Sequence, residues 1–417
     1  MNARNYQKKT LLIAFLLETI CVTYALKLTS LTGITSILFS LSGIVIAVCF
    51  LLIPEPTVVN NLTTQKKFFS YRWLLTIVAF IAISAAAVKW MEDAPLDYHE
   101  GDMLPIIKIM SQRFLNGNWR HVYDVIPEIW GGMQPIYLPA MWLPFSLPVF
   151  LGIDLRWMTV LVLFIVSALF IWRIQIQHKK APYLFFAAFL LIWWLLSAEN
   201  SGLIPYTEEG LVIGFYSLLA IALTKKNAWL IGFATALCIL SRYAIVGWLP
   251  AMIIYFTINK NYKKLLQFCL IGLICFIGFV LIPFGWQTFL KLAAIPSEYI
   301  GFTARVWHDA PVVFKESLGW AKFFGPKNIA LQHYLLVGMS LFFPMLFMMI
   351  ALSLQKKLSL TNHHLPFATL KITLVVFYTL VDVPYLYLFY TGSFVSLFLV
   401  TYLLAGDSIK NTILVKD

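Results

Sequence analysis

Long apolar runs follow one another along the whole chain, and they constrain its fold more than any other feature of the sequence. They fall at residues 10–26, 32–53, 73–89, 157–175, 183–198, 210–224, 228–258, 265–284, 331–353, 367–381 and 385–405. A helix needs about 20 apolar residues to cross a bilayer. We therefore expect an all-α polytopic membrane protein, a bundle of about 11 to 13 transmembrane helices.

The composition excludes several other classes of protein. Only 12% of the 417 residues are charged, whereas soluble domains carry roughly a quarter. The net charge is +12, but basic residues collect in the cytoplasmic loops of membrane proteins, so this excess does not point to nucleic acid. The five cysteines lie inside apolar runs and form no metal motif. A soluble enzyme, a secreted disulfide scaffold, a nucleic-acid binder and a disordered chain are excluded.

Basic pairs between the runs predict which loops are cytoplasmic. These pairs are Lys8/Lys9, Lys66/Lys67, Lys179/Lys180, Lys225/Lys226, Lys263/Lys264 and Lys356/Lys357. All of them can lie on one side only if residues 228–258 form a hairpin that is broken near Ser241–Tyr243. Residues 137–151 must also not cross, and their three prolines favour a re-entrant or interfacial path. Seven of the 19 acidic residues fall within 91–136, so we expect the chemistry on the acidic, extracytoplasmic face.

These assignments divide a single integral-membrane domain, residues 1–417, into five parts. The parts are 1–89 with the first three helices, 90–151 with an extracytoplasmic loop and the re-entrant segment, 152–284 with the central helices, 285–330 with a second extracytoplasmic loop, and 331–417 with the C-terminal helices.

The first long loop is predicted to be structured. Between Pro105 and Asn116 the apolar side chains recur at helical spacing, polar side chains occupy the other face, and Gly117 follows as a stop. An amphipathic helix beside a transmembrane helix is expected to lie along the membrane surface.

The segment MEDAPLDYHEGDMLP, just before that helix, holds five carboxylates within eleven residues. Clustered acids at a lipid–water boundary favour a raised pKa in one of them, which suits a general base. Asp102 is the first candidate, but it also stands where a residue would cap the helix, and the two roles are compatible. Asp97 is the second candidate.

Motifs along residues 90–260 resemble those of one family of enzymes. They are Gly101-Asp102-Met103, Arg113-Phe114-Leu115-Asn116-Gly117, Tyr123, Ile136-Tyr137-Leu138-Pro139, Ser197-Ala198-Glu199-Asn200 and Ser241-Arg242-Tyr243. In this order they resemble the GT-C superfamily of membrane glycosyltransferases, and within it glycosyltransferase family 87, the polyprenol-phosphate-mannose-dependent mannosyltransferases. Met103 and Leu138 depart from the family pattern. Asp97-Tyr98 has the Asp-aromatic pair at another spacing and therefore remains a competitor.

The resemblance implies a GT-C-like bundle and a set of site residues. Asp102 matches the family's acidic base, and Asp97 is the alternative. Tyr137, Glu199, Asn200 and Arg242 fall in motifs that would bind substrate. That the sugar is mannose follows from the resemblance alone.

Cations near the membrane could bind a lipid-linked sugar phosphate. Arg242 lies in the broken middle of an apolar run, where an ionisable residue is a functional candidate by default. Its guanidinium suits a phosphate, but pairing with an acid such as Glu199 or Asp382 is an equal alternative. In the second loop Arg305, His308 and Lys322 stand among aromatic residues, a pattern typical of sugar-phosphate sites and also of interfacial belts.

We therefore expect a multi-pass glycosyltransferase of a bacterial plasma membrane, with its site on the extracytoplasmic face. A hexose would pass from a polyprenyl-phosphate carrier to a glycan or lipid acceptor, with no nucleic acid involved. The departing phosphate is a good leaving group, so the chemistry calls for no metal or other cofactor, although a divalent cation stays open.

Three alternatives remain. A transporter or flippase of lipid-linked saccharide would line a path through many helices with polar groups, whereas the helices after residue 157 are expected to be nearly charge-free except for Arg242. An O-antigen ligase or polymerase would rely on Arg and His in a late loop rather than on acids in an early one. The last alternative is a structural membrane subunit.

Overall fold

The computed structural model describes residues 3–54, 65–173, 201–358 and 360–405. Regular structure in these residues is helical, apart from an isolated antiparallel bridge between Ile126 and Met133. The longer helices are α1 (Ala3–Thr23), α2 (Thr32–Leu52), α3 (Gln65–Glu92), α4 (Met103–Leu115), α7 (Arg156–Arg173), α9 (Glu209–Lys225), α10 (Ala228–Ile239), α11 (Trp248–Ile258), α12 (Tyr262–Phe276), α13 (Ile282–Asp309), α16 (Ile329–Leu358), α17 (Leu365–Leu380) and α18 (Phe389–Ala405). Short helices α5 (Pro139–Trp142), α6 (Ser146–Leu151), α14 (Val312–Lys315) and α15 (Ala321–Phe324) join them. The predicted all-α class is confirmed.

Five helices of the described residues are long and apolar enough to cross a membrane, or six if one bent pair counts as a span. The five lie at Leu28–Leu52, Arg72–Glu92, Tyr262–Asp309, Ile329–Gln355 and Leu386–Leu404. The chain is therefore a membrane-embedded protein. The larger number of crossings stays a prediction, because α9, α10, α11 and α17 have only 17, 12, 11 and 16 residues, fewer than the roughly 20 that a crossing needs.

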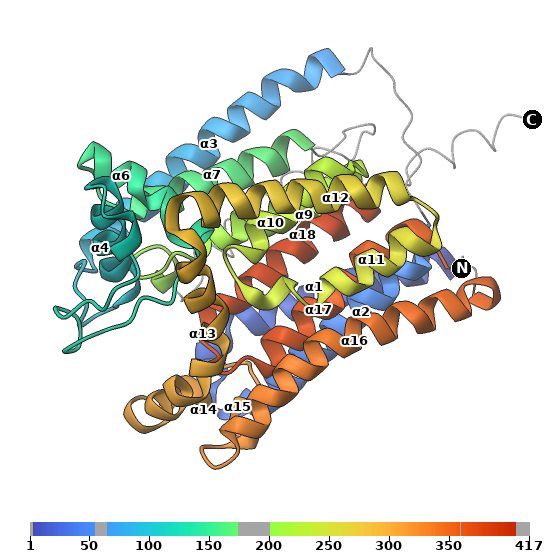
Figure 1. The fold of residues 1–417 in the computed structure, drawn as a ribbon. Coiled ribbons are helices and arrows are strands. Elements are labelled where there is room, and N and C mark those ends of the chain that lie inside the picture. The colour runs from blue at the N-terminus through green and yellow to red at the C-terminus, as the bar shows by residue number, and fades with distance from the viewer. Residues whose placement is uncertain (1–2, 55–64, 174–200, 359, 406–417) are drawn as a thin grey trace, which may run out of the picture.

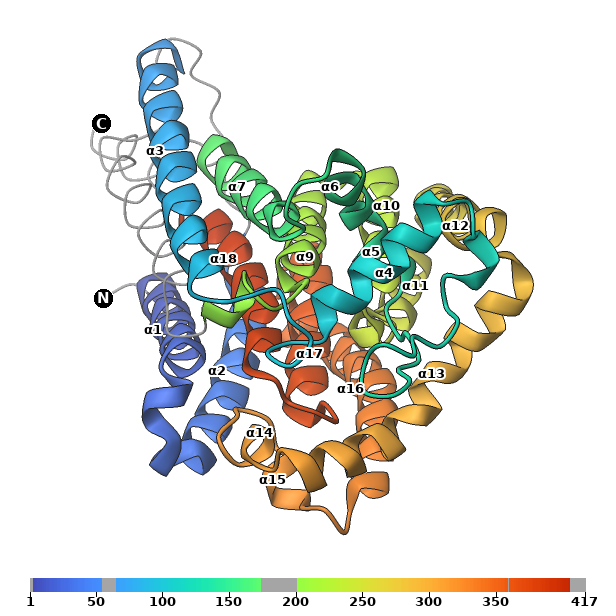
Figure 2. The ribbon, with the colours of Figure 1, turned by 90° about the vertical axis from the view of Figure 1, so that its left-hand side faces the viewer.

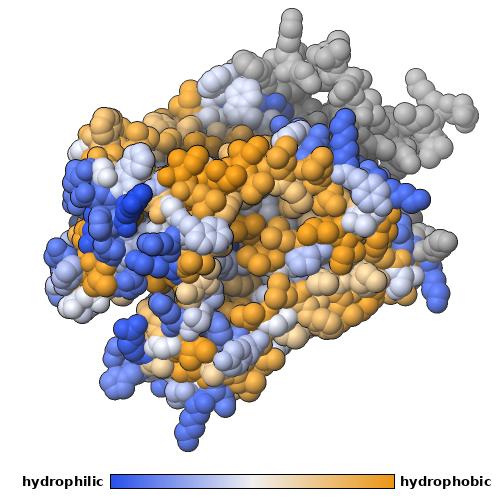
Figure 3. Space-filling model, in the orientation of Figure 1, coloured by the Kyte–Doolittle hydropathy of each residue, from blue (hydrophilic) through white to orange (hydrophobic). Residues whose placement is uncertain are grey.

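The outer surface separates into an apolar flank and a polar end. Hydrophobic side chains cover the flank formed by α12, α11 and α16, whereas hydrophilic ones gather at the end that carries α4 (Figure 3). Large apolar side chains on this flank, such as Leu266 and Phe342, are more than half exposed. A contiguous apolar surface of this kind is stable against lipid tails rather than water.

The two ends of the bundle carry different segments. At one end α4 and α6 lie together with α13, α14 and α15 (Figure 1). The start of α1 and the α11–α12 connection, which includes Lys260, lie at the other end. Figure 2, which looks onto the first end, shows α4 above α17 and α13 along the right and lower edge of the molecule.

The predicted amphipathic helix is confirmed as α4. Its buried face includes Ile106 and Met110, while Lys108 and Gln112 are exposed. The helix ends at Leu115, and Gly117 follows two residues later with a φ of +79°. The amides of Gly117 and its successor donate to the carbonyls of residues 114 and 113, which is the Schellman arrangement that glycine permits.

The run 228–258 breaks where the sequence predicts. Helix α10 ends at Ile239, Arg242 is extended (φ −157°, ψ 139°), and η5 (Tyr243–Ile245) leads into α11. The Leu240 carbonyl, freed by the break, accepts a hydrogen bond of 2.9 Å from the amide of Ala140 in α5. The break therefore joins the central helices to the first loop.

Prolines also shape the segment 137–151. It forms α5, the single turn η3 (Leu143–Phe145) and α6, and together these are bent by 116° against α7. Pro144 and Pro148 lack the amide hydrogen that a continuous helix would use.

The expected second loop, 285–330, is largely helical. Helix α13 (Ile282–Asp309) is kinked at Gly285, whose backbone is non-helical (φ +78°, ψ 174°), and Pro296 lies inside the helical stretch that follows. Helices α14 and α15 then return the chain to α16.

The expectation of nearly charge-free helices after residue 157 is wrong. Lys371 of α17 is buried and its Nζ lies 2.7 Å from both carboxylate oxygens of Glu18 in α1. Ser393 and Ser396 of α18 also donate to Glu18. The sequence pattern shows one lysine in an apolar run, but not the distant acid that neutralises it.

Candidate active site

A central cavity of about 1000 Å³ lies at the end of the bundle that carries α4. The term central cavity denotes the space between α4, η5, α13, α16 and the turn that joins α17 to α18. Its polar lining includes Asp102, Gln134, Tyr137, Glu208, Arg242, Tyr243, Glu298, Tyr299, Arg305, Asp309, His333, Asp382, Tyr385 and Tyr387. Four of the predicted site residues, Asp102, Tyr137, Arg242 and Arg305, are brought together here although they are distant in sequence.

Asp102 occupies the N-cap position of α4 but does not act as a cap. Within the described residues its side chain makes no capping hydrogen bond. It is half-buried, and this loss of water raises the pKa of the carboxyl above its ordinary range, partly offset by hydrogen bonds from its own backbone and from Trp130. A carboxylate with raised pKa that faces a cavity is a suitable general base.

Close packing fixes the backbone beside Asp102. A Cβ atom at Gly101 would lie 3.1 Å from Cδ1 and 3.2 Å from Cβ of Tyr206. Glycine therefore allows residues 101–102 to approach the segment that leads into Glu208 and α9. This approach explains why an early loop and a mid-chain helix share one cavity.

Arg242 reaches the cavity from the helix break and is paired with acids. Its Nη1 lies 2.6 Å from Oε2 of Glu209, and its Nη2 lies 3.6 Å from Oε1 of Glu208. The hydroxyl of Thr391 also donates to Glu209. The predicted alternative, in which Arg242 pairs with an acid, is therefore confirmed, but the partners differ from the two that were named. Asp382 pairs with His333, and Glu199 lies outside the described residues.

Tyr137 is held by a buried aromatic network. The hydroxyl of Tyr123 donates to the Tyr137 carbonyl (3.0 Å) and accepts from Nε1 of Trp142 (2.9 Å). Because α5 follows directly and is hydrogen-bonded to Leu240, this network fixes the wall of the cavity beside the helix break.

Arg305 lines the cavity from α13, is exposed, and has no ion-pair partner within the part of the chain that the structure describes. Neither His308 nor Lys322 lines it. His308 is exposed, and its Nδ1 lies 2.8 Å from Oδ1 of Asp309. The ammonium of Lys322 donates to the Ser317 carbonyl, and burial lowers its pKa to about 8.

Asp97 lies on the exposed loop outside the cavity lining. Its Oδ1 accepts a hydrogen bond of 3.1 Å from the amide of His99, which is a local turn of the kind aspartate forms. Asn200, like Glu199, lies outside the described residues.

Sequence reasoning missed a histidine–aspartate pair on the far wall. Nδ1 of His333 in α16 lies 2.8 Å from Oδ2 of Asp382, and both side chains are buried. The adjacent Gln332 donates to the carbonyls of Val381 and Leu380 and so fixes the turn. In sequence, Asp382-Val383-Pro384 is typical of a solvated turn, so only the packing of α16 against α17 reveals this pair.

The cavity combines carboxylates with phenol rings. Asp102, Glu208 and Asp382 supply oxygen acceptors, and Tyr385 stacks on Tyr387 with ring centres 5.5 Å apart. Hydroxyl-rich ligands match this lining, because carboxylates accept their hydroxyl hydrogens and aromatic rings cover their apolar faces.

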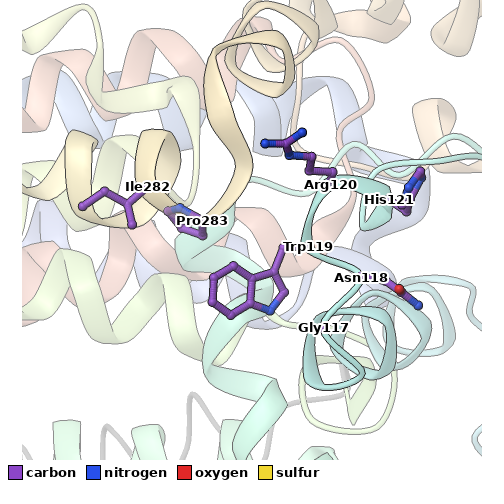
Figure 4. A pocket seen from close by; sticks show the side chains of 7 residues that line it. All are labelled: Gly117, Asn118, Trp119, Arg120, His121, Ile282 and Pro283. Carbon is purple, nitrogen blue, oxygen red and sulfur yellow. The ribbon is translucent and has the colours of Figure 1, made fainter.

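A second hollow, the outer groove, is smaller and carries no acid. Its volume is about 410 Å³, and it is lined by Gly117, Asn118, Trp119, Arg120, His121, Ile282 and Pro283 (Figure 4). The Trp119 ring points toward Pro283. No carboxylate lines this groove. His121 does line it, and its Nδ1 lies 2.7 Å from Oδ2 of Asp124.

No group of three or more His, Cys, Asp or Glu side chains that could hold a metal ion occurs in the described ranges. No family model, curated protein or solved structure matches the chain. The fold and the cavity define it as an all-α membrane protein with a cavity at one end that is lined by both polar and apolar side chains.

Proposed function

We propose that this protein is an integral-membrane glycosyltransferase of GT-C architecture, similar to glycosyltransferase family 87. It would transfer a hexose, mannose by resemblance, from a polyprenyl-phosphate carrier to a glycan or lipid acceptor. The observation that carries the proposal is the Asp102 carboxylate, which is not used as a helix cap and faces a cavity lined by Tyr137 and Arg305.

The transfer follows from these groups. The acceptor hydroxyl oxygen bonds to the anomeric carbon of the donor while the bond from that carbon to the phosphate oxygen breaks. The hydroxyl proton passes to Asp102, and the electron pair of the broken bond leaves with the polyprenyl phosphate. The product has an inverted anomeric centre, and Asp102 then releases its proton to water.

Arg305 is the cation that we assign to the departing phosphate. Arg242 also lines the cavity, but Glu209 and Glu208 already offset its charge. An arginine without a carboxylate partner can give its whole guanidinium to a phosphate.

The proposal also covers the topology and the cofactor requirement. We propose about 11 to 13 crossings, with the short helices α10 and α11 as the two arms of a hairpin. The membrane would be a bacterial plasma membrane, and the cavity would lie on its extracytoplasmic face. The reaction is proposed to need no cofactor.

A donor panel tests the activity. Membranes that carry the wild-type chain are supplied with radiolabelled hexoses on polyprenyl phosphate and on polyprenyl diphosphate, and lipid and glycan products are separated. Transfer from the monophosphate carrier supports the proposal. Transfer only from a diphosphate-linked glycan would favour a ligase or polymerase instead.

A transporter of lipid-linked saccharide is the second candidate. The buried Glu18–Lys371 pair favours it, because charged pairs inside membrane helices often belong to transport pathways. Movement of a labelled lipid-linked saccharide across vesicles, without sugar transfer, would support transport over glycosyl transfer.

A further inference from the structure

A tight loop at the rim of the cavity holds an exposed tryptophan. Ile126 and Met133 exchange two backbone hydrogen bonds of 2.9 and 3.0 Å, which close the loop that carries Trp130 at its tip. Ile126 and Ile129 are buried and anchor it. Trp130 itself is 58% exposed although it lines the cavity.

The backbone of Trp130 is strained. Its φ is +52°, a left-handed conformation that is unfavourable for a bulky side chain. Gly131 and Gly132 follow at φ +72° and +132°, so the turn relies on glycine everywhere except at the tryptophan. A strained residue persists where its surroundings over-determine it, and such residues cluster at functional sites.

Two kinds of contact hold the indole in place. Its N–H lies on the side of the Asp102 carboxylate and lowers the pKa of that group. Tyr98 and His99 meet the ring edge-on, with ring centres 5.5 and 5.6 Å away and interplanar angles of 88°. A tryptophan of an interfacial belt needs neither packed aromatic neighbours such as Tyr98 nor a strained backbone.

We propose that Trp130 forms the acceptor-sugar subsite, where its free ring surface takes the apolar face of a pyranose and its N–H fixes the carboxylate of Asp102. This inference rests on the proposed glycosyltransferase function. The subsite belongs to the acceptor because Trp130 lies on an exposed loop at the rim. The lipid-linked donor suits the apolar wall of the cavity instead, which includes Ile295 of α13 together with Leu336 and Val337 of α16.

Two substitutions separate the two roles of the indole. Trp130→Phe keeps an aromatic face but removes the N–H, and Trp130→Ala removes both. Because the hydrogen bond from Trp130 lowers the Asp102 pKa, we expect Trp130→Phe to move the acidic limb of the transfer rate to higher pH. Trp130→Ala should also raise the KM for the acceptor about tenfold, with the donor KM unchanged.

The assay uses the full chain in membranes, a radiolabelled polyprenyl-phosphate mannose donor and octyl α-D-mannopyranoside as acceptor probe. Trp286→Ala is the matched control, because Trp286 is 59% exposed on α13 and lies outside the cavity lining. It should change neither KM nor the pH profile.

Probe binding, measured by saturation-transfer NMR on purified protein, separates this inference from the proposed function. Binding that Trp130→Ala weakens about tenfold, without any sugar transfer, would support the subsite and contradict the proposed reaction. Transfer with an acceptor KM and a pH profile unchanged in both Trp130 variants would overturn the subsite and leave the reaction intact. Absence of both probe binding and transfer in the wild type would overturn both.

Discussion

Replacing Lys371 by methionine would leave the Glu18 carboxylate buried without its cation. Both side chains lie inside the bundle, at 1% and 0% exposure, and Nζ lies 2.7 Å from each carboxylate oxygen. The hydroxyls of Ser393 and Ser396 donate to the same carboxylate at longer distances of 3.3 and 3.2 Å. They cannot replace a full positive charge.

The expected loss of stability follows from this burial. Removing one partner of a buried ion pair costs about 3–5 kcal/mol, because the other charge stays desolvated and unpaired. Glu18→Gln should cost a similar amount by leaving the ammonium of Lys371 unpaired. The double variant buries no charge, and we expect it to recover most of the loss.

The free energy of unfolding is measured for four proteins: the wild type, Lys371→Met, Glu18→Gln and the double variant. Each is purified in detergent and unfolded with increasing SDS, and circular dichroism follows the loss of helix. The four values form a double-mutant cycle. Where detergent unfolding is irreversible, the unfolding rates of the same four proteins replace the equilibrium values. The matched control is His308→Gln, which breaks an exposed pair with Asp309 and should leave the transition unchanged. A coupling energy below about 1 kcal/mol would refute the reasoning, since a buried pair should be strongly non-additive.

Two further predictions concern packing and pH. Gly247→Ala should destabilise the protein, because a Cβ at Gly247 would overlap the backbone carbonyl of Ser340 where α11 meets α16. A detergent unfolding curve identical to that of the wild type would contradict this. The raised pKa of Asp102 should place the acidic limb of the transfer rate above the ordinary range of an aspartate, with the rate rising as pH increases through it, because the base must be ionised. A limb within the ordinary range, measured as kcat/KM against pH, would contradict the assignment. Because the pKa of Asp102 is higher in the folded protein than in the unfolded chain, its protonated form stabilises the folded state at low pH. This contribution to the free energy of unfolding is lost as pH rises through the raised pKa.

Local patterns in the sequence predicted local features of the fold. The amphipathic spacing before Gly117 indicated α4 and its end, and the polar residues near Arg242 marked the break between α10 and α11. Both follow from short-range rules of helix periodicity and helix termination. Asp102, Tyr137 and Arg242, which the motifs singled out, line one cavity, and their roles as site residues stay a prediction.

Long-range contacts lay beyond the reach of those rules. The sequence offers no signal that His333 meets Asp382, or that Glu209 approaches Arg242. Each pairing depends on how helices far apart in the chain pack, which a single sequence does not encode locally. The strained turn at Trp130 is the exception, since Trp130-Gly131-Gly132 is a short signal that could have marked a tight turn beside the cavity.

The most direct test of the central claim compares sugar transfer by Asp102→Asn and Asp97→Asn, at matched expression, with a radiolabelled polyprenyl-phosphate hexose. Asparagine keeps the shape of the side chain but cannot accept the proton. We predict that Asp102→Asn loses about 10²–10⁴-fold in rate, whereas Asp97→Asn, altered only on the exposed loop, keeps the wild-type rate. Wild-type transfer by Asp102→Asn, or loss of transfer in Asp97→Asn alone, would contradict the role of Asp102 as the base.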